Sequence, residues 1–297
     1  MISAIVTTYN PDLLIFAKLI ESVHPQVDNV VVVDNGSGPS IIPKIRAVIE
    51  FFPRISLIEN SQNNGVAAAL NQGFNFSVEV GADYVLLLDQ DSLPAFNMVH
   101  ELLLGLQQKI SKGEKIGAVG PNYSVLKGAI DPPFVKLHGH KLVRVDCSES
   151  QVVSVDHLIT SGSLIPVSAW LDIGGMEEGL FISYVDTEWC IRATMKGYQL
   201  YGVGCAGMIH DLGDDVSHFF GQTVPIYSPL RYYYTFRNSV WMIRCDWVPI
   251  EWKIVSIKRS MVFYIVYSLF LGRRFANWKM MMRGLWHGVK GKDGIIR

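Results

Sequence analysis

The sequence predicts an α/β protein with a mostly parallel sheet and helices on both of its faces. Strand and helix signals alternate from residue 3 to residue 119 with short connections, which is typical of βαβ units. The strand segments are short, unbroken apolar runs such as 84–88, which indicates strands buried on both faces. These two observations also place ligands at the carboxyl ends of the strands, as in other open parallel sheets.

The elements of the first half follow from local signals. Leu13, Phe16 and Ile20 have helical apolar spacing, with Asn10 as the expected N-cap and Pro11 at the first helical position. Pro94 likewise suits the first turn of a helix. In order, we expect a strand over 3–8, a helix over 12–23, a strand over 30–33, a helix over 41–51, a strand over 55–58, a helix over 66–78, a strand over 84–88, a helix over 94–110 and a strand over 116–119.

The second half begins with a change of character. Gly, Pro and His gather in residues 121–155, for example in 131–134, which predicts a loop or hairpin insertion. Asp186 or Thr187 can cap the helix expected near residue 186. Beyond the insertion we expect a strand over 152–159, a helix over 169–173 that ends at two glycines, a helix over 186–195, a strand over 198–203, a loop over 206–228 and an aromatic helix over 229–243.

The C-terminal segment carries a distinct charge. Residues 250–297 hold ten Lys/Arg and two acids although the whole chain has a net charge of −1, so a basic tail follows an acidic body. Two or three amphipathic helices with interleaved aromatic residues are expected over 250–290, a pattern that suits an interfacial helix on an anionic membrane. The apolar run 261–271 falls short of the roughly 20 residues needed to span a bilayer. The alternative is that these helices pack against the core of the protein and that their Lys and Arg side chains are only solvated.

Composition bounds the class of protein. A hydrophobic content of 49% with 18% charged residues favours a sizeable core and excludes wholesale disorder. The four cysteines form no CxxC pair, so free thiols in a reducing compartment are expected. The N-terminus lacks a basic region and a cleavage site, so we expect no signal peptide. We divide the chain into a main domain over 1–245, with two halves over 1–120 and 121–245, and a basic aromatic segment over 246–297 that suits membrane association.

Polar residues end four of the expected strands, and their combination is informative. Hydroxyls and aromatic rings can hold a nucleotide, and a carboxylate can accept from a ribose or base. No P-loop and no GxGxxG sequence is present, so a phosphate would be neutralised by metal rather than by a backbone cradle. The residues that we expect to bind a nucleotide sugar are Thr7, Tyr9, Asp34, Asn64, Gly65, Asp89 and Gln90.

Two carboxylates end the central strand. Asp89 and Asp91 are one residue apart, so both can point the same way at the strand end. Hard oxygen ligands suit Mg²⁺ or Mn²⁺, which commonly bridge a carboxylate to substrate phosphates. His210, in a loop after a strand, is a further candidate metal ligand, or it contacts a diphosphate. The alternative for residues 89–91 is an Asx-type turn between strand and helix. The alternative for His210 is a polar residue whose hydrogen bonds are all made within the protein.

Two more acids lie near a helix start. A carboxylate at Asp186 is kept ionised by the helix dipole and can take a proton from an attacking hydroxyl, as a general base must. Glu188 is a candidate for the acceptor side of the same pocket. The alternative is a capping Asp186 with a structural Glu188–Arg192 pair at i,i+4.

Seven motifs, read together, resemble the family 2 glycosyltransferases, and most closely their bacterial rhamnosyltransferase branch, which builds O-antigen and similar lipopolysaccharide polymers. The resemblance runs from residue 2 to about residue 290. The motifs are Thr-Thr-Tyr-Asn (7–10), Val-Val-Asp-Asn-Gly-Ser (32–37), Asn-Asn-Gly-Val-Ala-Ala-Ala-Leu-Asn-Gln-Gly (63–73), Leu-Leu-Asp-Gln-Asp-Ser (87–92), Ser-Gly-Ser-Leu-Ile (161–165), Tyr-Val-Asp-Thr-Glu-Trp-Cys-Ile-Arg (184–192) and Tyr-Tyr-Tyr-Thr-Phe-Arg-Asn (232–238).

The resemblance implies the glycosyltransferase A fold, a nucleotide-sugar donor, a divalent metal at a DxD motif and inversion at the sugar carbon. It implies that Asp91 holds the metal, that Asp89 contacts ribose or metal and that Asp186 is the base. It also places Ser161, Gly162 and Ser163 on the acceptor side. The branch usually has Asp where this chain has Ser183, and counting back from Arg192 puts the base on Asp186.

The resemblance thus implies an inverting transfer of L-rhamnose from dTDP-L-rhamnose to a lipid-linked saccharide, on the inner face of the cytoplasmic membrane. Another nucleotide-sugar donor, a nucleotidyltransferase and a non-catalytic saccharide-binding protein are the alternatives. We expect no nucleic-acid partner, and the sequence is compatible with a homo-oligomer.

Overall fold

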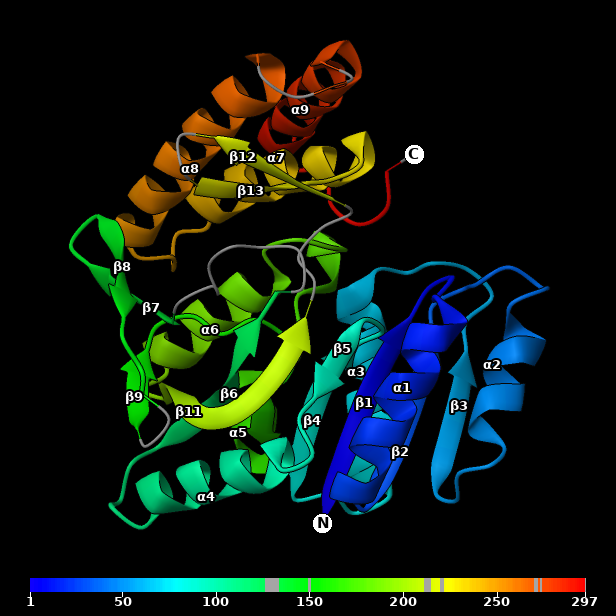
Figure 1. Ribbon diagram of the computed structural model, residues 1–297. Coiled ribbons are helices and arrows are strands. Elements are labelled where there is room, and N and C mark those ends of the chain that lie inside the picture. The colour runs from blue at the N-terminus through cyan, green and yellow to red at the C-terminus, as the bar shows by residue number, and fades with distance from the viewer. Residues whose placement is uncertain are drawn as a thin grey trace.

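A nine-stranded mixed sheet forms the centre of the molecule, with helices on both faces (Figure 1). The computed structural model describes residues 1–125, 134–148, 151–210, 215–219, 222–269, 272 and 274–296. The strand order is β3-β2-β1-β4-β10-β6-β11-β5, and β9 pairs with β11. Pairing is parallel from β3 through β4 and between β6 and β11, so the predicted mostly parallel α/β sheet is confirmed.

The elements have the following bounds. The sheet strands are β1 (Ile2–Thr8), β2 (Asn29–Asp34), β3 (Ile55–Glu59), β4 (Tyr84–Asp89), β5 (Ser92–Pro94), β6 (Ile116–Ser124), β9 (Val152–Val155), β10 (Leu164–Pro166) and β11 (Gln199–His210). Two hairpins lie outside this sheet and are formed by β7 (Phe134–His138) with β8 (Lys141–Val145) and by β12 (Asp215–Phe219) with β13 (Gln222–Ile226). The helices are α1 (Leu13–Val23), α2 (Ile42–Ile49), α3 (Val66–Glu79), α4 (Met98–Ile110), α5 (Val167–Ile173), α6 (Val185–Met195), α7 (Pro229–Arg244), α8 (Ile250–Leu269) and α9 (Arg274–Val289), with short 3₁₀ turns at His24–Gln26 and Glu178–Leu180.

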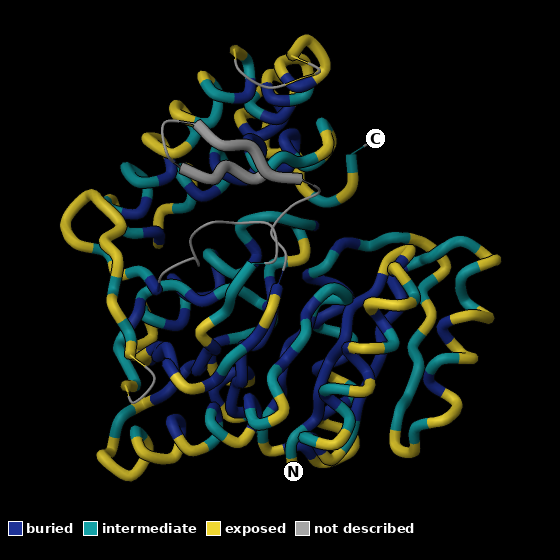
Figure 2. Tube along the Cα trace, in the orientation of Figure 1, coloured by how far each residue is buried: buried dark blue, intermediate teal, exposed yellow. Residues whose placement is uncertain are grey.

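Both faces of the central strands are buried, which explains their unbroken apolar runs. Successive residues point to opposite faces of a strand, so Ile5 and Leu87 pack under α3, α5 and α6. Val6 and Leu86 pack under α1, α2 and α4 on the other face. Figure 2 shows these strands as the buried centre of the molecule. The polar residues that follow the runs therefore emerge together at the carboxyl edge of the sheet.

The predicted helix start at Pro94 is wrong. Residues Ser92–Pro94 form β5, which pairs antiparallel with the end of β11, and the helix begins at Met98. The predicted loop over 206–228 is wrong in part, because β11 continues to His210 past a register shift between Val203 and Gly207. The glycines of this segment weaken the sequence signal for a strand, because glycine is depleted in strands. Residues 211–214 and 220–221 lie outside the described part of the chain.

Two predicted helix caps also differ. Asp12, not Asn10, accepts the N–H groups of Leu14 and Ile15 at the start of α1, and Asn10 lies before the helix with a φ of 47°. At α6 the N-cap is Tyr184, in the left-handed conformation, rather than Asp186 or Thr187. Asp186 therefore lies in the first turn of the helix.

The predicted hairpin insertion is confirmed for β7 and β8, while residues 126–133 and 149–150 lie outside the described residues. The C-terminal region forms two helices, α8 and α9, which pack with α7 beyond the carboxyl ends of the parallel strands (Figure 1). Tyr232, Tyr267 and Met281 form the buried centre of this helical layer. No helix in the described part of the chain is long and apolar enough to cross a membrane. The boundary proposed at residue 245 falls between α7 and α8 and stays a prediction.

Candidate active site

The carboxyl ends of three neighbouring strands bring polar residues to one edge. The register pairs Thr8 of β1 with Asp34 of β2, and Thr7 with Asp89 of β4. Thr7 is buried, whereas Tyr9, one step beyond the strand, is 48% exposed and free to stack on a flat ligand. The Tyr9 N–H donates to Gln90 Oε1 at 2.7 Å, which ties the ends of β1 and β4 together.

Asp34 is fully buried and already has several donors. It accepts from Thr8 Oγ1 at 3.0 Å and from the Ser37 N–H at 2.8 Å, and the Ser37 hydroxyl also donates to it. A carboxylate accepts about four hydrogen bonds, so little capacity remains for a ligand. The structure thus gives Asp34 a role in shaping the turn after β2, and its contact with a nucleotide stays a prediction.

The loop before α3 is held by a residue that sequence reasoning did not select. The Asn35 amide donates to Asn63 Oδ1 and to the Gly65 carbonyl at 3.1 and 3.0 Å, and its oxygen accepts from the Asn64 N–H at 3.0 Å. Gly65 has a φ of +90°, and a Cβ there would lie 2.6 Å from the Phe181 carbonyl oxygen. Asn64 and Gly65 therefore belong to a loop that passes close to the segment before α6.

A cluster of metal-ligating groups lies at the end of β4. Ligand atoms of Asp89, Asp91 and His210 all fall within 4.8 Å of one another. His210 reaches the cluster because β11 pairs with β5, and its Nδ1 lies 3.4 Å from Asp91 Oδ1 and 3.2 Å from Ser92 Oγ. The three residues predicted as metal ligands are thus together, although the sequence placed His210 in a loop.

The chemistry of this cluster fits a divalent cation. Two carboxylates and an imidazole are hard or borderline donors of the kind that bind Mn²⁺, and the carboxylates also suit Mg²⁺. Burial raises the pKa of Asp89; the negative charges of Asp91 and Asp186 raise it too, while the charges of His210 and Arg231 oppose the increase. A bound cation would relieve this unfavourable concentration of negative charge.

Asp186 lies near this cluster, within electrostatic range of Asp89. Its Oδ1 accepts the Thr187 N–H at 2.7 Å, and its Oδ2 lies 3.7 Å from His157 Nε2. Burial favours the neutral acid, but the nearby His157 imidazole, the Thr187 N–H and the charge of Arg259 outweigh it, so the pKa of Asp186 lies below its usual range. The carboxylate is therefore ionised at neutral pH, as a base must be.

The segment that leads into α6 is strained and clamped. Phe181, Ser183 and Tyr184 all have φ values near +65°, which is unfavourable for residues with side chains. The buried Asn238 amide lies 2.8–2.9 Å from three carbonyl oxygens of residues 180, 182 and 183. Arg237 adds bonds to the carbonyls of residues 179 and 180 at 2.8 Å. Sequence reasoning included both residues in a motif but could not show that they hold the segment before the candidate base.

The predicted acceptor-side residues are largely occupied by internal contacts. Ser161 is fully buried, accepts the Asp89 N–H at 3.2 Å and hydrogen-bonds Ser92. Ser163 donates to the Ile159 carbonyl at 2.7 Å, and between them the Gly162 N–H donates to Leu87. This turn supports the end of β4, and its contact with an acceptor stays a prediction.

Glu188, the remaining residue predicted for the acceptor side, is buried and paired with Arg192. Both of its oxygens accept from Arg192 at 2.7 Å, and Arg192 also donates to the carbonyls of Ile173 and Gly175. This is the structural i,i+4 pair that was the alternative interpretation. Contact between Glu188 and an acceptor stays a prediction.

Comparison with known proteins identifies the family. The model of the family described as glycosyl transferase family 2 matches residues 3–127. The chain is 31% identical to the dTDP-rhamnosyl transferase RfbF of Shigella flexneri over 269 residues. This matched region covers 90% of this chain and 86% of RfbF. The chain belongs to glycosyltransferase family 2. It is a glycosyltransferase, as the sequence motifs predicted.

Solved structures share the fold of this glycosyltransferase. GalNAc-T7 with UDP, GalNAc and Mn²⁺ aligns with a TM-score of 0.61 at 15% identity over 98% of this chain, which spans 56% of the GalNAc-T7 chain. S. aureus TarS 1-349 aligns with a TM-score of 0.59 at 14% identity, over 97% of this chain and 80% of that one. The predicted glycosyltransferase A fold is confirmed. At these identities the likeness concerns the fold alone.

Proposed function

We propose that this glycosyltransferase moves L-rhamnose from dTDP-L-rhamnose to a lipid-linked saccharide, with inversion and with Mn²⁺ or Mg²⁺ bound at Asp89, Asp91 and His210. The observation that carries the proposal is the ionised Asp186 carboxylate within electrostatic range of a metal-ligating cluster. The donor is supported by the relative RfbF, whose name describes a dTDP-rhamnosyl transferase.

The proposed chemistry is divided between Asp186 and the metal-ligating cluster. Asp186 takes the proton of the acceptor hydroxyl, whose oxygen forms a bond to the anomeric carbon as the bond to the diphosphate breaks. One base and one displacement invert the configuration at that carbon. A cation held by Asp89 and Asp91 would supply neutralising charge for the departing diphosphate.

Contacts at the donor side support nucleotide-sugar binding. Tyr9 offers an exposed ring near the buried Thr7. The Gln90 side chain accepts a hydrogen bond from the Tyr9 N–H and so joins the end of β1 to the segment that carries the metal cluster. Arg231, at the start of α7, stacks over Tyr227 at 4.3 Å, and its charge lowers the pKa of Asp89. An arginine close enough to Asp89 to lower the pKa of its carboxyl can contribute to holding a diphosphate at the metal cluster.

The C-terminal helices support an acceptor presented at an anionic membrane surface. Exposed residues lie along α8 and α9 (Figure 2), and several of them are large and apolar. An exposed apolar surface of this kind is typical of membrane or protein interaction sites. Trp286 is 60% exposed and has Lys290 at 4.8 Å from its ring centre. We propose that this surface binds the inner face of the cytoplasmic membrane. Its exposed apolar residues include Met261, Val262, Ile265, Leu269, Phe275, Trp278, Met282, Trp286 and Val289.

A calorimetric donor screen with and without Mn²⁺ or Mg²⁺ tests the proposal. We expect selective, metal-dependent binding of dTDP-L-rhamnose and release of dTDP on addition of acceptor. Selective binding of another nucleotide sugar, such as UDP-GlcNAc, would overturn the donor assignment, and release of pyrophosphate would point to a nucleotidyltransferase.

Two variants test the roles of the carboxylates. Asp91→Asn is expected to abolish metal-dependent transfer, and full activity of the native protein in EDTA would remove the metal from the proposal. Asp186→Asn is expected to lose turnover while donor affinity stays unchanged, because the carboxylate acts on the acceptor hydroxyl. Unchanged turnover would exclude Asp186 as the base.

A further inference from the structure

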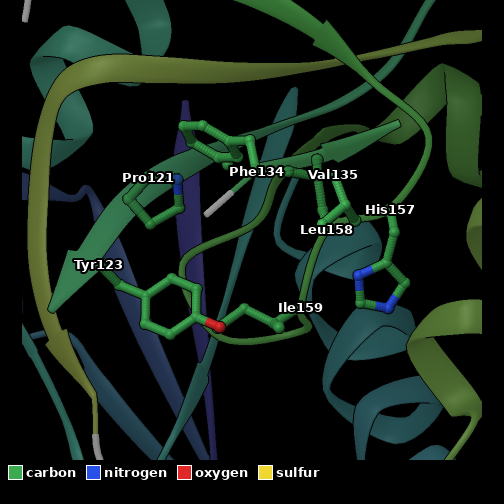
Figure 3. A pocket seen from close by; sticks show the side chains of 8 residues that line it. Pro121, Tyr123, Phe134, Val135, His157, Leu158 and Ile159 are labelled. Carbon is green, nitrogen blue, oxygen red and sulfur yellow. The ribbon is translucent and has the colours of Figure 1, made fainter. Parts of the chain in front are cut away.

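His157 contacts the candidate base, and no sequence motif pointed to it. Figure 3 shows its ring at one side of a cavity of about 30 Å³, with Tyr123 at the opposite side. The Nε2 atom lies 3.7 Å from Asp186 Oδ2 and 3.2 Å from the Thr187 hydroxyl. One ring nitrogen thus faces both the carboxylate and the residue that follows it.

The backbone around His157 is anchored on two sides. The Asp156 N–H donates to the Val135 carbonyl at 3.0 Å, and a β-bridge joins Val135 to His157. On the other side Leu158 exchanges contacts with the buried Cys190 thiol of α6, at 3.5 and 3.6 Å. The ring therefore holds a fixed place between the β7–β8 hairpin and α6, rather than lying on a free loop.

A partly buried base near other carboxylates needs a cationic or hydrogen-bonding partner. Desolvation favours the protonated acid, and a protonated Asp186 cannot accept the acceptor proton. Of the charged and titratable groups near it among the described residues, only His157 contacts the carboxylate within 4.0 Å. The others are Tyr123 of β6, Asp89 of β4, Cys190 of α6 and Arg259 of α8.

We propose that His157 is a positioning residue for the transfer reaction, holding Asp186 Oδ2 while the Thr187 N–H holds Oδ1, so that the anionic carboxylate keeps one orientation toward the acceptor. The inference rests on the proposed role of Asp186 as the base. A carboxylate held at both oxygens loses little rotational freedom when the acceptor arrives, which favours the reactive geometry.

The His157→Ala and His157→Gln variants of the full chain test this role. Alanine removes the contact and the charge, so we expect kcat to fall about 10- to 100-fold with donor affinity unchanged. Glutamine restores a hydrogen-bond donor without charge and is expected to recover part of kcat. His100→Ala, an exposed histidine of α4, is the matched control and should behave as the native protein.

The pH profile separates positioning from a merely structural contribution. His157 lowers the pKa of Asp186, so both variants should raise that pKa and lose kcat/KM at a higher pH on the acidic side than the native protein. An unchanged acidic limb in the glutamine variant, whose folding is checked by circular dichroism, would overturn the inference, as would native kcat in the alanine variant.

The Asp186→Asn variant distinguishes the two levels of the argument. If it is inactive while the His157 variants keep the native pH profile, the base assignment stands and only the role of His157 fails. If it keeps native turnover, Asp186 is not the base and both assignments fail.

Discussion

Replacing Asn238 by alanine is expected to lower both stability and kcat while leaving donor affinity unchanged. Asn238 lies in α7, is fully buried and touches no part of the metal cluster through any described hydrogen bond. Its amide instead holds the carbonyls of Leu180, Ile182 and Ser183, the segment that leads into the helix of the candidate base.

The magnitude follows from the contacts that are lost. The Leu180 carbonyl keeps a hydrogen bond from Arg237, whereas the carbonyls of Ile182 and Ser183 lose the described partner, at a cost of about 1–3 kcal/mol each. We therefore expect the free energy of unfolding to fall by about 2–6 kcal/mol. Phe181, Ser183 and Tyr184 each hold a positive φ at a cost on the order of 1–3 kcal/mol, so the released segment should relax and shift the first turn of α6.

The assay combines denaturant unfolding, donor calorimetry and turnover measured well below the melting temperature of the variant. A shift of about 1 Å in the base is enough to lower kcat by about 100-fold. Asn238→Asp keeps the shape and the acceptor for Arg237 but removes the amide donors, so it should match the alanine variant. Asn75→Ala, at an exposed position of α3, is the control. Native kcat in a destabilised Asn238→Ala protein would refute the link between this clamp and the base.

Three further predictions concern the loop before α3, the donor side and the C-terminal helices. Gly65→Ala should lose about 2–5 kcal/mol of stability, because its φ is +90° and the new Cβ would lie 2.6 Å from the Phe181 carbonyl oxygen; a native melting temperature would contradict this. Arg231→Ala should weaken donor binding about 10- to 100-fold in calorimetry, since a charge-assisted hydrogen bond contributes about 1.5–3 kcal/mol, and unchanged affinity would remove Arg231 from the donor side. Phe275→Ser with Trp286→Ser should reduce binding to anionic vesicles more than tenfold in a sedimentation assay, by the loss of two exposed aromatic anchors; equal binding would place the membrane surface elsewhere.

The sequence predicted the parallel core and the metal carboxylates because both depend on local patterns. A buried strand is an unbroken apolar run, and Asp89 and Asp91 follow one directly. The placement of His210 depends on pairing between β5 and β11, two segments more than a hundred residues apart, so no local pattern could place it. A lone histidine such as His157, with no motif around it, gives no signal until the fold brings it to α6.

The contacts of Ser183 lead us to expect that this departure from the usual Asp of the branch leaves the enzyme active. In the structure its backbone has a φ of 65°, its carbonyl is held by Asn238 and its hydroxyl accepts from Thr235 at 3.3 Å. These contacts belong to the clamp before α6, whereas the carboxylate that lies within electrostatic range of Asp89 and contacts His157 is that of Asp186. We therefore expect a side chain at position 183 to affect the reaction through the conformation of the segment that it occupies, because the proposed mechanism assigns the proton transfer to Asp186.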